Sequence, residues 1–596
     1  MSILYYATSL SPQNQHIAQI QTDPLHQPKA ARAGFAALTN PTALYYNKFN
    51  AGRSSKPAKN FQYSLIFYFL PPPHLTAALP GKRSAMYSVI KSFGLSGLNG
   101  FAVEVEADVA GGMPALSIVG LPDSAVRESG DRVHAAIKNL GFKWPDRRIT
   151  VNLAPADVRK TGPVYDLPLL LAVLSAAGQI EVPPEDAAFL GELALDGSLR
   201  PVSGVLPMAL EAAATGVKAL YVPAENAAEA AEACGDAMKV YPARNAREVV
   251  NALQGVAALA PAASVPFDPA EGWNTAPDFA DVMGQPLARR AMVLAAAGGH
   301  NVLLIGAPGT GKSMLAKRLP GILPPLSREE AVETTKIYSI AGQMPKGRGL
   351  VTARPFRSPH HSASAVSLAG GGAQFRPGEC SLANCGVLFL DELPEFSRES
   401  LEVLRQPLED GQITVSRAAG SATYPSHFQL VAAMNPCKCG YYGHPTRACT
   451  CSLSAVRQYR SRVSGPLLDR IDLCVEMDPV AFDQLHASAS AESSAELRKQ
   501  VLAARQIQQK RYAAPGFEGV HCNAQLTAGQ VRRICRMTPA AERLLRASYD
   551  ALGLSARAHD RILRVARTVA DLAGKQLLDE DALLEALQYR AQEKIE

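Results

Sequence analysis

The feature that most constrains this chain is a glycine-rich octet, Gly-Ala-Pro-Gly-Thr-Gly-Lys-Ser, at residues 306–313. The apolar run at 301–305 before it predicts a buried strand, and the segment 314–318 after it predicts a helix. A glycine-rich loop between a strand and a helix is typical of a phosphate-binding loop, in which backbone N–H groups and the positive end of the helix face the phosphates. The predicted nucleotide-binding residues are Gly306, Ala307, Pro308, Gly309, Thr310, Gly311, Lys312 and Ser313. Lys312 is expected to reach the terminal phosphates, and Ser313 is expected to bind Mg²⁺.

Two adjacent carboxylates form the second feature. Residues 387–392 read Val-Leu-Phe-Leu-Asp-Glu, so four apolar residues predict a buried strand with Asp391 and Glu392 at its carboxyl end. Open α/β sheets place their ligands at that end of the strands. A helix cap after a strand would explain Asp391 alone, but it does not explain the pair. We therefore expect Asp391 to reach the Mg²⁺ ion, Glu392 to activate the attacking water, and the chain to hydrolyse ATP.

Composition sets the broad class of the protein. A chain of 596 residues predicts several domains, because single hydrophobic cores stop growing near about 300 residues. The net charge of +6 allows an anionic partner without requiring one. No apolar stretch reaches the length of about 18 residues that spans a bilayer, and the run at 65–70 is too short for a signal peptide. Ten cysteines in so long a chain do not suggest a disulfide scaffold, so a cytoplasmic location with reduced thiols is expected.

The pattern along the chain predicts an α/β multidomain protein. Residues 1–85 are rich in Asn, Gln, Pro and Ser and are expected to be a disordered extension or a mis-assigned start. Residues 86–254 read as an α+β domain, and 255–277 read as a linker rich in Ala and Pro. Residues 278–480 form the predicted ATPase core. Residues 495–596 have helical periodicity throughout and predict a C-terminal helical bundle.

Local patterns predict several individual elements. Apolar and charged residues alternate over 101–109, which predicts a half-buried strand, and Asp123 is expected to cap a helix. The segments 191–199 and 413–424 are each expected to form a hairpin, and Asp579 is expected to cap the last helix.

Longer motifs carry a family resemblance. These are Asp-Phe-Ala-Asp-Val-Met-Gly-Gln at 278–285, Arg-Pro-Phe-Arg-Ser-Pro-His-His at 354–361, Pro-Gly-Glu at 377–379, Asp-Glu-Leu-Pro-Glu-Phe at 391–396 and Gly-Pro-Leu-Leu-Asp-Arg-Ile-Asp at 465–472. With the two nucleotide motifs, they resemble the AAA+ ATPases. In detail they resemble the Mg-chelatase-like family, the ComM/YifB group of bacterial competence-related proteins, over roughly residues 86–590.

The resemblance implies further site residues. Asn435, at the end of the apolar run 429–434, would be sensor 1, Arg470 would be the arginine finger acting on a neighbour's ATP, and Arg557 would be sensor 2. An isolated arginine is more often part of a surface ion pair, which is the alternative for the last two. A finger acting in trans requires a homo-oligomer, and the family implies a hexamer. The chain departs from the family at Asn384, where a His is usual, so no histidine function is expected there.

Three functions stay open from the sequence. The resemblance to ComM implies a motor on single-stranded or branched DNA, a branch-migration helicase that supports natural transformation. A basic stretch (Lys346, Arg348, Arg354, Arg357, His360, His361 and Arg376) and the hairpin at 413–424 would then contact DNA. The alternative is a chelatase-type motor for metal insertion or another remodelling task, although chelatase subunits act with separate large partners.

The third function is proteolysis. Residues 86–254 resemble the Lon-protease-like (S5-like) domain, also found in ChlI-type proteins. Lon chemistry needs a Ser after a Gly-Pro pair and a Lys to deprotonate it. Here Val164 follows Gly162-Pro163, and the segment where the Lys would fall, 205–208, reads Val-Leu-Pro-Met. We therefore expect no peptidase activity from this domain and instead a binding or assembly role.

Two Cys-x-Cys pairs follow sensor 1. Cys437 and Cys439 lie on one side of a polar loop that contains His444, and Cys449 and Cys451 lie on the other. Four thiolates could bind a structural Zn²⁺ ion, although the spacing is tighter than the usual Cys-x₂-Cys. Free cysteines beside a loop are the alternative.

Overall fold

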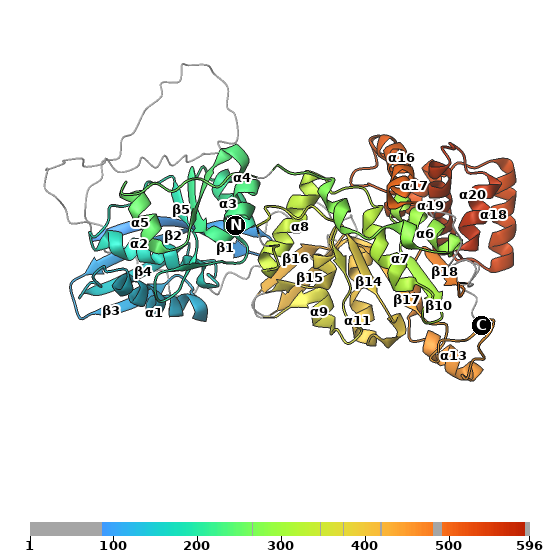
Figure 1. The fold of residues 1–596 in the computed structure, drawn as a ribbon, viewed down its shortest axis with the longest axis horizontal. Coiled ribbons are helices and arrows are strands. Elements are labelled where there is room, and N and C mark those ends of the chain that lie inside the picture. Colours follow the sequence, from blue (N-terminus) through green and yellow to red (C-terminus); the bar gives the residue numbers. More distant parts are fainter. Residues whose placement is uncertain are drawn as a thin grey trace, which may run out of the picture. The chain divides into compact units, whose positions relative to one another are not determined.

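The computed structural model describes residues 86–264, 266–345, 347–372, 375–417, 420–480 and 492–590. All of them belong to one compact unit, residues 81–596. The prediction for residues 1–85 lies outside the described residues. Within the described ranges, mixed α/β structure with parallel sheet pairing confirms the predicted fold class in its broad form (Figure 1). No helix in these ranges is both long enough and apolar enough to cross a bilayer.

The first sheet has seven strands in the order β3-β4-β2-β1-β5-β8-β9. Its strands are β1 (Tyr87–Ser96), β2 (Asn99–Ala110), β3 (Ala115–Val119), β4 (Arg148–Ala154), β5 (Ala187–Phe189), β8 (Ala219–Pro223) and β9 (Lys239–Ala243). In β2 the side chains of Val103, Val105, Ala107 and Val109 are buried and those between them face outward, which confirms the predicted alternation. β2 pairs antiparallel with β1 and β4, while the other neighbours in the sheet pair in parallel.

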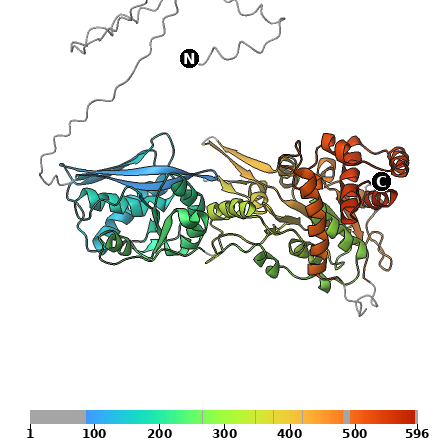
Figure 2. The ribbon, with the colours of Figure 1, turned by 90° about the horizontal axis from the view of Figure 1, so that it is seen from above.

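Five helices accompany this sheet: α1 (Ser124–Asn139), α2 (Asp166–Ala176), α3 (Val205–Ala214), α4 (Ala227–Cys234) and α5 (Ala246–Leu253). Figure 2 shows the long strands β1 and β2 lying along one side of these helices. The Asp123 carboxylate accepts the Val126 N–H and so caps α1, as predicted. β6 (Glu192–Leu193) and β7 (Leu199–Arg200) pair antiparallel, which confirms the hairpin predicted at 191–199.

The second sheet is fully parallel, with the order β11-β14-β17-β10-β18. Its strands are β10 (Val302–Gly306), β11 (Phe356–Arg357), β14 (Val387–Leu390), β17 (Gln429–Met434) and β18 (Leu473–Met477). Val302 and Leu304 enter one hydrophobic core, and Leu303 and Ile305 enter another. Both faces of the sheet are therefore covered, which explains why these strands read as continuous apolar runs.

Short helices and two small sheets surround the second sheet. The helices are α6 (Pro286–Gly298), α7 (Lys312–Arg318), α8 (Arg328–Ala341), α9 (Ala365–Ala369), α10 (Glu379–Leu382), α11 (Arg398–Val403), α12 (Arg405–Asp410), α13 (Leu453–Arg460) and α14 (Gly465–Leu468). The small sheets are β12 (Gly370–Gly371) with β13 (Arg376–Pro377), and β15 (Gln412–Arg417) with β16 (Gly420–Pro425). Ile413 lies opposite Tyr424, so the predicted β15–β16 hairpin is confirmed.

The C-terminal helices are α16 (Ser494–Tyr512), α17 (Ala528–Ile534), α18 (Pro539–Leu552), α19 (Ala556–Leu572) and α20 (Glu580–Gln588). Their apolar side chains share one core with α6 and one face of the second sheet. Figure 1 shows α16 and α19 beside α6. Buried His300 lies 3.2 Å from the Asp472 carboxylate and 2.7 Å from the Thr568 hydroxyl, which connects the start of β10 to α19. Asp579 caps α20, as predicted.

A buried polar contact joins α8 to α4. The Ser339 hydroxyl donates to Glu229 Oε2 at 2.7 Å, and the Asn226 amide donates to Glu229 Oε1 at 2.7 Å. Desolvation raises the pKa of Glu229, although these hydrogen bonds oppose that shift. Leu206, at the start of α3, packs nearby with Leu326. The segment where a Lon-type lysine would fall is thus part of a packing surface.

Candidate active site

The phosphate loop leaves β10 at Gly306 and enters α7 at Lys312. Gly309 and Gly311 have φ angles of +84° and +93°, a left-handed conformation that favours glycine. The Thr310 hydroxyl donates to the Ala307 carbonyl at 2.9 Å and holds the turn. These angles explain why glycine is needed at two positions of the octet, and α7 begins with its free N–H groups at the end of the loop.

The Lys312 side chain is buried, with 8% of its surface exposed. Its ammonium group donates to the carbonyls of Gly306 and Ala307 at 2.6 and 2.9 Å, and to the Asn435 side-chain oxygen at 3.2 Å. Burial lowers the pKa of Lys312, whereas the nearby carboxylates of Asp391 and Glu392 oppose this effect. The Lys312 amine thus lies beside Asn435, the predicted sensor 1, and close enough to Asp391 and Glu392 to interact with their charges.

Ser313 and Asp391 meet at the predicted magnesium position. The Ser313 hydroxyl donates to Asp391 Oδ2 at 2.7 Å. Two oxygens that share one Mg²⁺ in neighbouring octahedral positions lie about 2.9 Å apart, since Mg–O bonds are about 2.0–2.1 Å long. These two residues therefore fit the ion that the sequence predicts. The other oxygen, Asp391 Oδ1, accepts the Glu392 N–H at 3.0 Å, and this hydrogen bond helps to orient the carboxylate.

Glu392 has a histidine partner that the sequence reasoning did not identify. His361 Nδ1 lies 3.1 Å from Glu392 Oε2, and the rings of His360 and His361 are 4.0 Å apart. Glu392 itself has a φ angle of +53°, which is uncommon for a residue with a side chain. The sequence places both histidines in the basic stretch that is expected to contact DNA. The only signal in the sequence was their place in the motif at 354–361.

The two predicted arginines lie in different surroundings. Arg470 donates to the carboxylate of Glu409 at the end of α12 and to the Pro466 carbonyl. Arg557 is exposed in the first turn of α19. Arg561, one turn later, is buried and donates to Asp469 at 2.9 Å. The same helical face therefore carries one solvent-facing arginine and one that anchors α19 to the 465–472 motif.

Three arginines of the predicted basic stretch have carboxylate partners in the chain. Arg348 pairs with Glu271 at 3.0 Å, Arg354 with Glu330 at 3.1 Å, and Arg357 with Glu379 at 2.7 Å. The last pair joins two of the family motifs. Each arginine is therefore paired with a carboxylate of the chain. This pairing partly neutralises the positive charge that could attract a phosphate group.

Asn384, where the family usually has His, is fully buried. Its amide donates to Glu333 at 2.8 Å, and its carbonyl accepts the His427 N–H at 2.9 Å. The residue therefore joins α8 to the start of β17.

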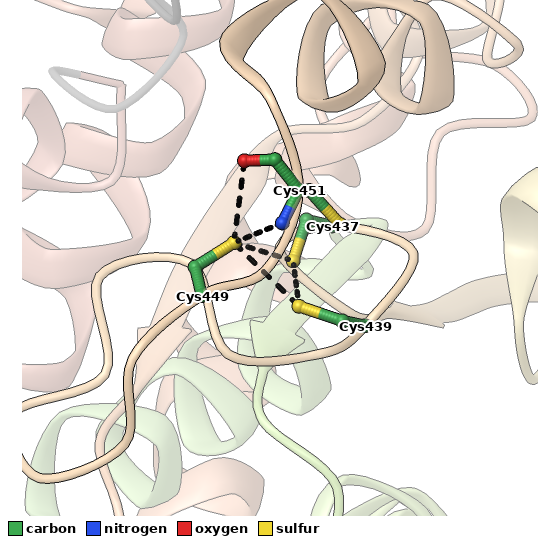
Figure 3. A group of neighbouring side chains, drawn as sticks. All are labelled: Cys437, Cys439, Cys449 and Cys451. Carbon is green, nitrogen blue, oxygen red and sulfur yellow. Dashed lines mark hydrogen bonds between the residues drawn. The ribbon is translucent and has the colours of Figure 1, made fainter.

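The four cysteines form a compact group, which we call the cysteine cluster (Cys437, Cys439, Cys449 and Cys451). Their sulfur atoms all lie within 4.8 Å of one another, and none forms a disulfide (Figure 3). Backbone hydrogen bonds from Tyr441 and Thr450 lower the pKa of Cys439 to about 5. This group could hold a metal ion. The group does not include His444, whose Nδ1 accepts the backbone N–H groups of Thr446 and Arg447.

Comparison with known proteins gives matches along most of the chain. Residues 278–485 match the magnesium chelatase subunit ChlI family, 105–226 match the family described as subunit ChlI of Mg-chelatase, and 491–590 match the ChlI C-terminal family. An uncharacterised protein of Mycobacterium tuberculosis is 44% identical over 503 residues, which cover 84% of this chain and 97% of that protein.

Two further relatives match over a similar length, and the name of the first bears on function. Competence protein ComM of Haemophilus influenzae is 42% identical over 510 residues, 85% of this chain and 97% of that protein. The uncharacterised protein YifB of Escherichia coli is 42% identical over 511 residues, 85% of this chain and 98% of that protein. A weaker match, 26% identity over 187 residues, is to the Lon protease of Mycolicibacterium smegmatis, and it covers 24% of that protein.

Proposed function

Because the chain belongs to the Mg-chelatase-like ComM/YifB family of AAA+ ATPases, we propose that it is an ATP-driven motor that acts on DNA as a ring. The observation that carries the ATPase part is the meeting of four motif residues at one edge of the parallel sheet. Lys312 and Ser313 begin α7 after β10, Asp391 follows β14, and Asn435 follows β17, yet hydrogen bonds of 2.7 and 3.2 Å connect these residues in pairs.

Each residue has a defined task in this proposal. Lys312 and the backbone N–H groups of the phosphate loop bind the phosphates, and Ser313 and Asp391 would hold Mg²⁺. When bound, Mg²⁺ offsets negative charge on the phosphate oxygens. Glu392 accepts a proton from the attacking water, after its carboxylate has turned away from His361. Asn435 orients that water.

Two arginines would supply further positive charge to the phosphates of ATP. Arg470 would act on the ATP of a neighbouring copy, and Arg557 would contact the nucleotide of its own subunit. The Arg470 side chain is 10% exposed and its Glu409 partner is 55% exposed, so the guanidinium would have to leave Glu409 and turn outward to reach a neighbour's phosphate. A homo-oligomer, with a hexamer as the expected form, follows from this division of tasks.

The proposed substrate of the motor is DNA, in single-stranded or branched form. The name of the competence protein ComM supports a function in natural transformation, for which we propose branch migration. The β15–β16 hairpin is the favoured contact, because it exposes Thr414, Ser416, Ser421 and Thr423 on one face. Arg348, Arg354 and Arg357 are less suitable because they are already paired with glutamates.

The test is an ATPase assay of the full chain with and without single-stranded, double-stranded and branched DNA. The expected result is hydrolysis that rises when DNA is added, together with displacement of a strand from a branched substrate. The Lys312→Ala variant is the control for contaminating activity. Stimulation only by a porphyrin-binding protein partner would instead favour the chelatase-type motor, and no hydrolysis in any of these conditions would refute the motor.

The proposal includes a cytoplasmic location, where thiols remain reduced, and Zn²⁺ as the ion of the cysteine cluster. Four thiolates complete a tetrahedral shell and leave no position for water, so this ion would have a structural role.

A further inference from the structure

We propose that the cysteine cluster is a tetrahedral Zn²⁺ site that braces the loop between β17 and α13 against the phosphate loop, so that metal binding supports nucleotide binding. The loop comprises residues 436–452 and is called the cysteine loop below. The metal site rests on the geometry of the cluster alone. Its effect on ATP rests on the proposed function.

The distances between the sulfur atoms fit one shared ion. Cys437 Sγ lies 3.3 Å from Cys439 Sγ and 3.7 Å from Cys449 Sγ, and the latter two are 3.5 Å apart (Figure 3). A zinc ion with four Zn–S bonds of about 2.3 Å places its sulfurs about 3.8 Å apart. A disulfide would require about 2.05 Å. The observed spacing is thus far too long for a disulfide and close to the edges of a ZnS₄ tetrahedron.

The chemistry of the ligands selects the metal. Soft thiolates in a tetrahedral S₄ arrangement favour zinc or iron–sulfur chemistry over Mg²⁺ or Ca²⁺, which prefer oxygen ligands. An iron–sulfur cluster places several atoms between the cysteines and would hold their sulfurs farther apart than a single ion does. The Cys451 N–H also donates to Cys449 Sγ at 3.4 Å, a hydrogen bond that stabilises negative charge on that sulfur.

The cysteine loop is attached to the nucleotide site at its beginning. Pro436 and the fully buried Cys437 directly follow Asn435, whose side chain accepts from Lys312. Arg460, at the end of α13, donates to the Pro436 carbonyl at 2.9 Å. A shift of the first cysteine would therefore move Asn435 as well.

The middle of the loop touches the phosphate loop directly. Gly440 has a φ angle of +87° and lies so close to Pro308 that an added Cβ would be 2.7 Å from Pro308 Cδ. Pro308 is the third residue of the octet. At its other end, Cys451 precedes Ser452, which caps α13. An ion that joins Cys437 and Cys439 to Cys449 and Cys451 closes the loop at both sides of Gly440 and holds it in this contact.

The experiment uses the full chain, purified with a reducing agent and without chelators. Elemental analysis should give about one zinc per chain, as four thiolate ligands to one ion require. A mercurial reagent that blocks thiols should release this zinc to a metal-sensitive dye. Cys449→Ala and Cys451→Ala should each lose the zinc, whereas Cys385→Ala, a cysteine outside the cluster, should retain it.

Nucleotide binding is then measured for the same proteins with a fluorescent ATP analogue. The dissociation constant should rise roughly tenfold in the two zinc-deficient variants, a typical effect of removing the support of a site, and remain unchanged in Cys385→Ala. Gly440→Ala should keep its zinc yet bind nucleotide more weakly, because its methyl group meets Pro308. Circular dichroism melting identifies any variant that has unfolded, and Gly440→Ala tests the brace without touching a ligand.

The outcomes separate the two parts of the idea. Protein with four reduced thiols and no zinc would overturn the metal site, and iron in place of zinc would overturn the identity of the ion. Zinc-free variants and Gly440→Ala that bind nucleotide as tightly as the unmodified chain would overturn the brace. Failure of the proposed motor appears elsewhere, as unmodified chain that binds zinc and nucleotide but does not hydrolyse ATP with any DNA.

Discussion

Replacement of Lys312 by alanine should weaken nucleotide binding strongly while leaving the fold intact. The ammonium group makes three hydrogen bonds within the free chain, to two loop carbonyls and to Asn435, and it can exchange these for phosphate oxygens. A hydrogen bond to a charged group is worth about 1.5–3 kcal/mol. Loss of one such net contact raises the dissociation constant for ATP by about 10- to 150-fold, at about 1.4 kcal/mol per factor of ten.

The stability of the free chain should respond differently. Because burial lowers the pKa of Lys312, the folded chain binds that proton less tightly than the unfolded chain does. The contribution of Lys312 to stability therefore rises as the pH climbs from its folded pKa to its unfolded pKa. The cost of burying the amine offsets the gain from its three hydrogen bonds, so Lys312→Ala should melt near the temperature of the unmodified chain when no nucleotide is present.

The assay is titration with a fluorescent ATP analogue, followed by thermal melting with and without ATP. Lys317→Ala is the matched control, because Lys317 lies on the same helix and is exposed. The variant should lose the rise in melting temperature that ATP gives the control, since only a ligand that binds the folded state stabilises it. A dissociation constant within about threefold of the control would refute the assignment of Lys312 to the phosphates.

Four other variants test the residues proposed for hydrolysis. Glu392→Gln should bind ATP normally and hydrolyse it about 10²- to 10⁴-fold more slowly, because it lacks a base; normal turnover would contradict this role. His361→Ala should change basal turnover by no more than about fivefold, since a partly exposed pair is worth about 1 kcal/mol or less; a hundredfold loss would instead make His361 a direct participant. Arg470→Ala should bind ATP but fail to hydrolyse it, whereas Glu409→Gln, which frees Arg470, should remain active. Full activity of an oligomer in which every subunit carries Arg470→Ala would exclude a finger acting between subunits.

The sequence predicted those parts of the site that depend on a short segment. The octet at 306–313 and the run at 387–392 each combine an apolar strand with its polar end, and their strands are parallel. Parallel strands bring their carboxyl ends to one edge of a sheet, so the meeting of Ser313 with Asp391 follows once both segments are recognised. The cysteine pairs were predictable for the same reason, since each pair is local.

Contacts between distant segments were not predictable in this way. His361 lies 31 positions before Glu392, and no local period indicates that the loop after β11 turns toward the end of β14. The contact between Gly440 and Pro308 spans an even longer stretch of chain. The pairing of Arg348 with Glu271 was equally hidden in the sequence, because the two residues lie 77 positions apart.

A short stretch of chain connects the His361 partner of Glu392 to the β15–β16 hairpin. His361 lies four positions before α9, and Ala369, the last residue of α9, packs against the buried side chains of the β15–β16 hairpin. A protein interior is close-packed, so a displacement of the hairpin must be accommodated by its neighbours. A displacement of the hairpin, the proposed DNA contact, can therefore be transmitted through α9 to His361. For the proposed motor we expect that a DNA strand bound at the hairpin shifts α9 and weakens the contact between His361 and Glu392.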